Sequence, residues 1–68
     1  MAGRDLTGEE LAVLRLASQG LTLEQAADEL GVSIATVTRR RADIFRKLRA
    51  KTLPHAVAIA IRQGLIDG

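Results

Sequence analysis

The chain has 68 residues, of which 47% are hydrophobic, and its net charge is +2. This length predicts one small domain, residues 1–68, and the hydrophobic content argues against disorder. The sequence has no Cys, so a disulfide framework and a thiolate metal site are excluded. Phe45 is its one aromatic residue, so the stacking platforms of single-strand binding proteins are missing. No apolar run approaches the roughly 18 residues of a membrane span, and we expect no membrane association and a cytoplasmic location.

The first predicted helix covers residues 8–19, after a leader over 1–6 that we expect to be loosely ordered. Thr7 and Glu10 have the spacing of a capping box, in which each side chain binds the other residue's backbone amide. Gly20 predicts the end of the helix, because glycine readily adopts the left-handed conformation there. The residues expected on the core side are Val13, Leu14 and Ala17.

The second predicted helix covers residues 23–30 and also begins with a capping box, formed by Thr22 and Gln25. Its apolar residues follow the spacing of one buried helical stripe: Leu23, Ala26, Ala27 and Leu30. Gly31 predicts its end, and Ser33 caps the next helix only two residues later. This short connection is typical of a helix-turn-helix.

The third predicted helix, 34–49, is the basic element of the chain. The segment from Arg39 to Lys51 holds seven of the ten Lys and Arg residues and one acid, Asp43. At about 100° per residue, Val37, Ile44 and Leu48 form a buried stripe, with Ile34 and Phe45 at its edge. The side chains on the opposite face are Ala35, Arg39, Ala42, Asp43 and Arg46. Arg41 lies among the core residues, so we expect its stem to pack while its charged head reaches solvent. Charge concentrated on one helix indicates phosphate binding.

The fourth predicted helix, 53–63, is capped by Thr52, carries Pro54 in its first turn and stops at Gly64. It is apolar nearly all round. With Val57 as the direction of the core, the inward residues are Leu53, Ala56, Ala60 and Ile61. The residues left facing outward are His55, Ala58, Ile59 and Arg62, which we predict to form a weak homodimer contact centred on Ile59. Leu65 and Ile66 are expected to fold back onto the first and fourth helices.

Motifs from each of these segments together resemble the LuxR/GerE-type DNA-binding domain, the four-helix output module of bacterial transcription regulators. The matching residues are Leu6-Thr7, Glu10, Val13-Leu14, Gly20-Leu21-Thr22, Ala27, Leu30-Gly31-Val32-Ser33, Thr36-Val37, Ile44-Phe45, Lys47-Leu48, Ala56-Val57, Ala60 and Gly64-Leu65-Ile66. They cover about residues 6–67. The resemblance implies an all-α four-helix bundle in which helix 34–49 lies in the major groove, the second helix braces it and the fourth forms the dimer contact.

The resemblance also implies which side chains meet the DNA. Thr38, Arg39 and Ala42 match the positions from which family members reach base edges. The residues that match or flank phosphate-contacting positions are Ser33, Thr36, Arg40, Arg46, Lys47, Arg49 and Lys51. The sequence departs from the family pattern at Glu9, Glu24 and Thr38, where the family usually has cations. We therefore expect the second helix to approach the backbone less closely.

Other classes of function fit the sequence less well. The chain has one His, His55, with no nucleophile at a fixed spacing, and its acidic pairs are neighbours that do not face one another on a helix. We therefore expect no enzymatic activity and no cofactor. One alternative is a promoter or polymerase-associated factor similar to the fourth region of sigma factors, although that region would leave 52–66 unexplained. Another is a protein-binding module whose fourth helix docks on RNA polymerase or another regulator.

The boundaries of the natural protein stay open at this point. A stand-alone bacterial or phage regulator and a domain cut from a larger regulator both fit the sequence.

Overall fold

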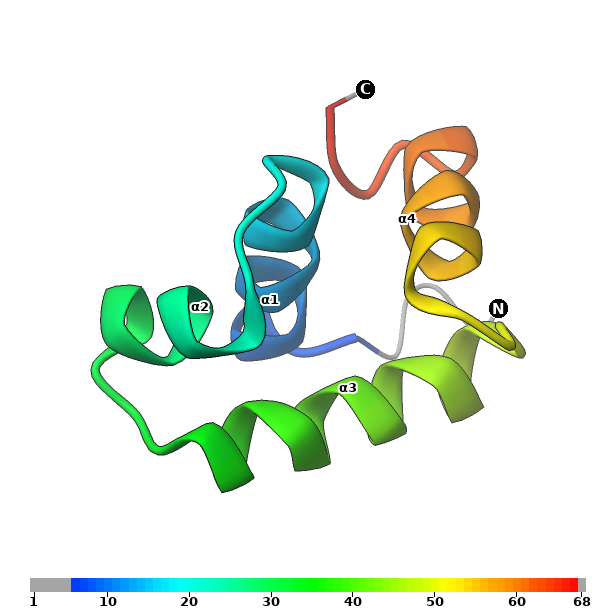
Figure 1. The fold of residues 1–68 in the computed structure, drawn as a ribbon. Coiled ribbons are helices and arrows are strands. Elements are labelled where there is room, and N and C mark those ends of the chain that lie inside the picture. Colours follow the sequence, from blue (N-terminus) through cyan, green and yellow to red (C-terminus); the bar gives the residue numbers. More distant parts are fainter. Residues whose placement is uncertain (1–5, 68) are drawn as a thin grey trace.

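The computed structural model describes residues 6–67 as an all-α fold (Figure 1). Its helices are α1 (Gly8–Ser18), α2 (Leu23–Leu30), α3 (Ile34–Leu48) and α4 (Leu53–Arg62). Residues 6–67 contain no strand. Each helix begins at the predicted residue and ends within one residue of the predicted end. The predicted helical bundle with a helix-turn-helix at α2 and α3 is therefore confirmed.

The hydrogen bonds at the helix starts explain this agreement. In α1 the Thr7 hydroxyl accepts from the Glu10 amide at 3.2 Å, and the Glu10 carboxylate accepts from the Thr7 amide at 2.9 Å. Thr22 and Gln25 form the same reciprocal pair at α2. Gly31 follows α2 with a φ of +68°, so the chain reverses tightly into α3. These local bonds satisfy backbone groups that would otherwise lack partners at the helix ends.

The core lies where α1, α2 and α4 meet one side of α3, the helix along the lower side of the molecule in Figure 1. Leu14 of α1 and Ile44 of α3 are 0% exposed. The remaining buried apolar residues are Val13, Ala26, Ala27, Val37, Leu48, Ala50, Ala56, Ala60 and Ile66. The burial of Ile66 agrees with the predicted fold-back of the C-terminal segment. Because every large inner residue of α3 is held in this core, its opposite face is left for solvent.

The predicted orientation of α4 is confirmed at Ala56 and Ala60 and is wrong at Ile59 and Ile61. The fully buried residues are Ala56 and Ala60, both 0% exposed, and Ile59 beside them packs against the core instead of facing outward. Ile61, which was predicted to face inward, is 38% exposed. Small side chains at positions i and i+4 let the helix backbone approach its neighbours closely, so α4 docks through its alanines. Its larger residues then lie beside this contact or outside it.

Two smaller differences concern the ends of elements. Of the predicted loosely ordered leader, residues 1–5 lie outside the described residues, and Leu6 packs against the core. At the end of α3, Arg49 adopts a left-handed φ of +56° without being a glycine. This reversal turns the chain back toward the hydrophobic core, where Ala50 is buried at 9% exposure.

Among residues 6–67, no helix is both long and apolar enough to cross a membrane.

Candidate nucleic-acid interface

The outer face of α3 presents the residues that the sequence predicted for base contact. Thr38, Arg39 and Ala42 are all exposed. Arg39 and Ala42 lie opposite the buried stripe of Val37 and Ile44, whose burial fixes the rotation of the helix, and Thr38 lies at the margin of that face. A groove-binding helix must present side chains in this way, on a face supported from behind by a packed core. The contact with bases itself stays a prediction.

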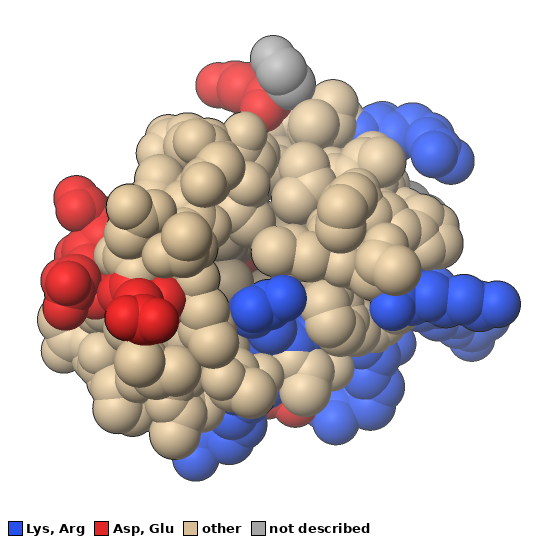
Figure 2. All heavy atoms as spheres, viewed as in Figure 1, with Lys and Arg blue, Asp and Glu red and all other residues tan. Residues whose placement is uncertain are grey.

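Charge is unevenly distributed over the surface. Figure 2 shows blue cationic side chains along the lower and right-hand edges and red acidic ones on the left, over α2. The exposed cations of α3 and the following turn are Arg39, Arg46, Arg49 and Lys51. By contrast, α2 carries Glu24, Asp28 and Glu29, all exposed, and no Lys or Arg. A polyanion is therefore attracted to the α3 side and repelled by α2.

Two hydroxyls lie at the start of α3, where phosphate contacts were predicted. The Ser33 Oγ accepts from the Thr36 amide at 3.1 Å, and the two hydroxyl oxygens are 2.9 Å apart. A helix N-terminus carries a partial positive charge, so it favours a nearby anion. Ser33 is exposed and Thr36 half-buried, so both are positioned at this end of the helix while they cap it.

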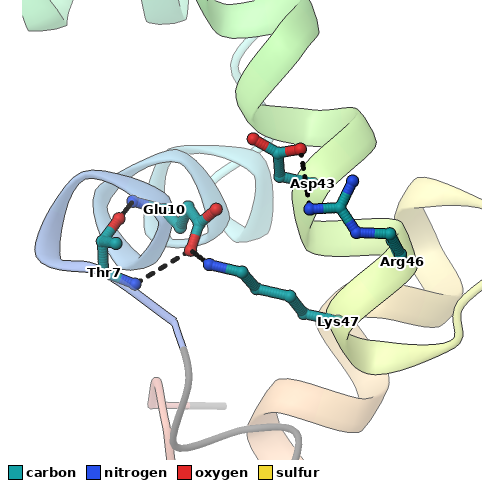
Figure 3. Close-up of polar contacts among 5 residues, drawn as sticks. All are labelled: Thr7, Glu10, Asp43, Arg46 and Lys47. Atoms are coloured by element: carbon teal, nitrogen blue, oxygen red, sulfur yellow. Dashed lines mark hydrogen bonds and ion pairs between the residues drawn. The ribbon is translucent and has the colours of Figure 1, made fainter.

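An ion pair that the sequence reasoning missed joins α3 to α1 (Figure 3). The Lys47 Nζ donates to the Glu10 Oε1 at 2.8 Å, and the exposed fractions of the two side chains are 24% and 5%. Burial raises the pKa of Glu10, but the hydrogen bond from Lys47 and the Thr7 amide outweigh it and hold the pKa below its ordinary value. Lys47, predicted to contact phosphate, thus already has an anionic partner.

A weak signal for this pair was present in the sequence. Glu10 lies four residues before Leu14, so a helical α1 carries both on one side. A carboxylate on a buried face needs a cation. Which of the ten cations supplies it could not be read, because Lys47 is 37 residues away.

Arg41 behaves differently from the other arginines of α3. It is half-buried and lines a small apolar pocket with Val13, Leu21 and Leu53, so the predicted packing of its stem is confirmed. Its Nε atom is buried without a hydrogen-bond partner among residues 6–67. Arg41 therefore belongs to the junction of the helices rather than to the exposed basic face.

His55 makes hydrogen bonds within the turn between α3 and α4. Its Nδ1 accepts from the Lys51 amide at 3.3 Å, and its own amide donates to the Thr52 hydroxyl at 3.2 Å. His55 therefore takes part in the capping of α4. In the described part of the chain, no group of His, Cys, Asp and Glu side chains could hold a metal ion.

An apolar groove lies between α4 and the end of α1. It is lined by Ala17, Ser18, Leu53, Pro54, Val57, Ala58 and Ile61. Of the residues predicted for a dimer contact, Ala58 lies in this groove, His55 and Arg62 are exposed, and Ile59 is turned toward the core. The predicted dimer residues therefore do not share one outward face, and the dimer contact itself stays a prediction.

Comparison with known proteins identifies the same family that the sequence motifs resemble. A family described as "Bacterial regulatory proteins, luxR family" matches residues 4–60. The transcriptional regulatory protein YdfI of Bacillus subtilis (strain 168) is 39% identical over 61 residues, which are 90% of this chain and 29% of that protein. The oxygen regulatory protein NreC of Staphylococcus carnosus (strain TM300) is 34% identical over 64 residues, 94% of this chain and 30% of that protein.

A third relative covers the same region. The transcriptional regulatory protein FixJ of Rhizobium meliloti (strain 1021) is 37% identical over 59 residues, 87% of this chain and 29% of that protein. The chain thus spans about three tenths of the length of these curated relatives. No solved structure matches it significantly.

Proposed function

Because the chain belongs to the luxR family of bacterial regulatory proteins, we propose that it binds duplex DNA sequence-specifically with α3 in the major groove. Family membership makes it a helix-turn-helix domain of DNA-binding transcription regulation and not an enzyme. The observation that carries the proposal is the exposed outer face of α3, with Arg39 and Ala42 opposite the buried Val37 and Ile44. The packed core behind this face supports a rigid approach to the DNA.

Within this proposal, Arg39 is the main base-reading side chain. Its guanidinium can donate two hydrogen bonds to the acceptors on a guanine edge, which discriminates by about 1–3 kcal/mol. Thr38 and Ala42 are adjacent on the same exposed surface and offer a hydroxyl and a methyl group. Exposed cations toward the end of α3, Arg46 and Arg49, and Lys51 after it are placed to neutralise phosphates.

Selection of bound sites from random duplexes tests this assignment. We expect the parent to enrich one motif and Arg39→Ala to flatten the preference at the position that Arg39 reads, while binding to other sequences persists. Arg15→Ala is the matched control, because Arg15 is an exposed arginine of α1. If Arg39→Ala weakens all sequences equally, Arg39 contacts only phosphate. A parent without DNA binding at any salt concentration would favour a module that binds protein alone.

We further propose that two copies pair weakly through the groove on α4. Ile61 is 38% exposed there beside Pro54, Val57 and Ala58, and a second copy covers such a face through a two-fold contact. Burying an Ile contributes roughly 1.5–3 kcal/mol, and this small patch must offset the entropy of association. The free protein should therefore be monomeric at micromolar concentration and pair on DNA, with two α3 helices on successive half-sites.

Two isoleucine variants test the dimer. Ile61→Glu should keep the helical fold and lose cooperative occupation of a palindromic site, whereas binding to a single half-site persists. Ile59→Glu should unfold the domain instead, because Ile59 packs against the core. Gel-shift titration on one and two half-sites, with circular dichroism as the fold control, measures both. An Ile61→Glu variant that occupies paired sites as cooperatively as the parent excludes this groove as the contact.

A further inference from the structure

The helices of residues 6–67 all end in the same way. Just beyond each helix lies a residue with positive φ, and the amide of the next residue donates to the carbonyl five residues back, which is the Schellman motif. The residues with positive φ are Gly20, Gly31, Arg49 and Gly64. Three of these turns therefore use glycine, whereas the turn after α3 uses arginine.

The backbone of this turn gives no reason for a side chain at position 49. The Ala50 amide donates to the Phe45 carbonyl at 2.9 Å, and both groups belong to the backbone, so a glycine at position 49 keeps this bond. The left-handed conformation of Arg49 crowds the Cβ of an L residue against the backbone, and glycine avoids this strain. Arginine is therefore the less stable choice for the turn.

The Arg49 guanidinium does not offset this strain within the described part of the chain. Among residues 6–67 it makes no hydrogen bond and no ion pair, and the residue is exposed. A cation near a helix C-terminus interacts favourably with the helix dipole, but Arg46 and Lys47 already provide positive charge in the last turn of α3. The guanidinium of Arg49 is thus available to a ligand outside the chain.

The turn also holds Arg49 at a fixed place. Its neighbours Leu48 and Ala50 are buried, at 6% and 9% exposure, so the core anchors the backbone on both sides. Arg39 lies ten residues earlier, roughly 15 Å along the helix axis at about 1.5 Å per residue. The major groove is about 12 Å wide. When Arg39 is among the bases, Arg49 therefore reaches the level of the sugar-phosphate backbone.

We propose that Arg49 is a preset phosphate-binding residue, kept in a strained turn for its guanidinium although glycine gives a more stable fold. This inference rests on the proposed DNA binding and adds to it a conflict between stability and affinity at one position. The rigid turn fixes the start of the side chain before the duplex arrives, so little backbone freedom is lost on binding. The guanidinium is a strong donor to phosphate oxygens.

Two substitutions separate the backbone of Arg49 from its side chain. Arg49→Ala removes the guanidinium and keeps the strain, whereas Arg49→Gly removes both. In a salt titration with a random-sequence duplex, each should lower the slope of log K against log salt by about 0.9, the value for one phosphate contact. In urea unfolding without DNA, Arg49→Gly should have a higher midpoint than the parent and than Arg49→Ala.

Gly64→Arg is the matched control. Gly64 ends α4 with the same motif and a φ of +73°, and no atom lies within 4 Å of an added Cβ. Figure 1 shows this end of α4 on the opposite side of the molecule from α3. The variant should therefore unfold at a lower urea concentration than the parent and bind the duplex with an unchanged salt slope. Circular dichroism confirms the helical fold of each variant before titration.

Two results overturn the inference. One is a lower urea midpoint for Arg49→Gly than for the parent, because the guanidinium then stabilises the fold. The other is a parental salt slope in both Arg49→Gly and Arg49→Ala, because Arg49 then contacts no phosphate. A parent without salt-dependent binding refutes the DNA-binding proposal itself, so the two failures are distinguishable.

Discussion

Helices α3 and α4 use their apolar residues in opposite ways. In α3 the large residues Val37 and Ile44 are buried, at 1% and 0% exposure, and the outer face is charged. In α4 the alanines Ala56 and Ala60 are buried, and Ile61 is 38% exposed. Size alone therefore does not decide which residues enter this core. An alanine at a close helix crossing is buried more completely than an isoleucine on the far side.

Because of this difference, the surfaces of α3 and α4 suit different kinds of partner. The cations of α3 attract a polyanion, whereas α4 has one charged residue, Arg62, and borders an apolar groove. In the proposed function, a duplex on α3 and a second copy on α4 would use different helices, so one would not block the other. The four predictions that follow test the contrast between inner and outer residues, first in α3 and α4 and then in the contact of α3 with α1.

The largest effect is expected at the inner face of α3. Ile44→Ala should destabilise the domain by about 2–5 kcal/mol, because a fully buried side chain is lost and a cavity remains. A chain of this size has about 3–5 kcal/mol of stability to lose, so the variant should be largely unfolded. Ile61→Ala on the outer side of α4 should cost less than about 1 kcal/mol. Urea unfolding followed by circular dichroism measures both, and equal losses would contradict the contrast.

The inner face of α3 is expected to be sensitive to the loss of side-chain volume, whereas the inner face of α4 should be sensitive to added volume. Ala60→Leu should destabilise the domain by about 1–3 kcal/mol, because the close crossing has no room for a larger side chain. Ala58→Leu is the control, since Ala58 is exposed, and it should be nearly neutral. If Ala60→Leu is tolerated as well as Ala58→Leu, the alanine contact does not determine how α4 docks.

The ion pair between α1 and α3 gives the third test. Lys47→Met should cost about 1–3 kcal/mol, because the buried Glu10 carboxylate loses its charged donor. Arg46→Met removes the exposed partner of Asp43 and should cost no more than about 0.5 kcal/mol. Thermal unfolding of both variants at neutral pH gives the comparison. Equal costs would mean that burial of Glu10 does not strengthen its pair with Lys47.

Acidic pH should weaken the ion pair between Glu10 and Lys47 that attaches α3 to α1. We expect this change in stability to be the smallest of the four predicted effects. The pKa of Glu10 is lowered in the folded protein from its ordinary value of 4.5. Its contribution to stability is therefore complete above pH 4.5 and is lost as the pH falls through the lower, folded-state value. Glu10→Gln should be less stable than the parent at neutral pH and less dependent on acid. Urea titrations between neutral and acidic pH test this, and parallel pH profiles would contradict it.

Much of the fold could be predicted because its signals are local. Thr7, Thr22 and Ser33 each accept a hydrogen bond from a backbone amide three residues ahead, so the starts of three helices can be read from adjacent letters. Gly31 marks the tight turn of the helix-turn-helix by its conformational freedom. The rotation of α3 could also be predicted, since a strongly amphipathic helix has one apolar side to bury.

The composition and order of the residues by themselves determined the four helices, the turn between α2 and α3, and the outward direction of Arg39 and Ala42. Only the tertiary structure decided which isoleucine of α4 packs inward and the pairing of Lys47 with Glu10. The sequence placed Ala56 and Ala60 of α4 inward, but which isoleucine packs beside them depends on how closely the neighbouring helices approach. Likewise, a cation finds its carboxylate across 37 residues only after both helices have packed.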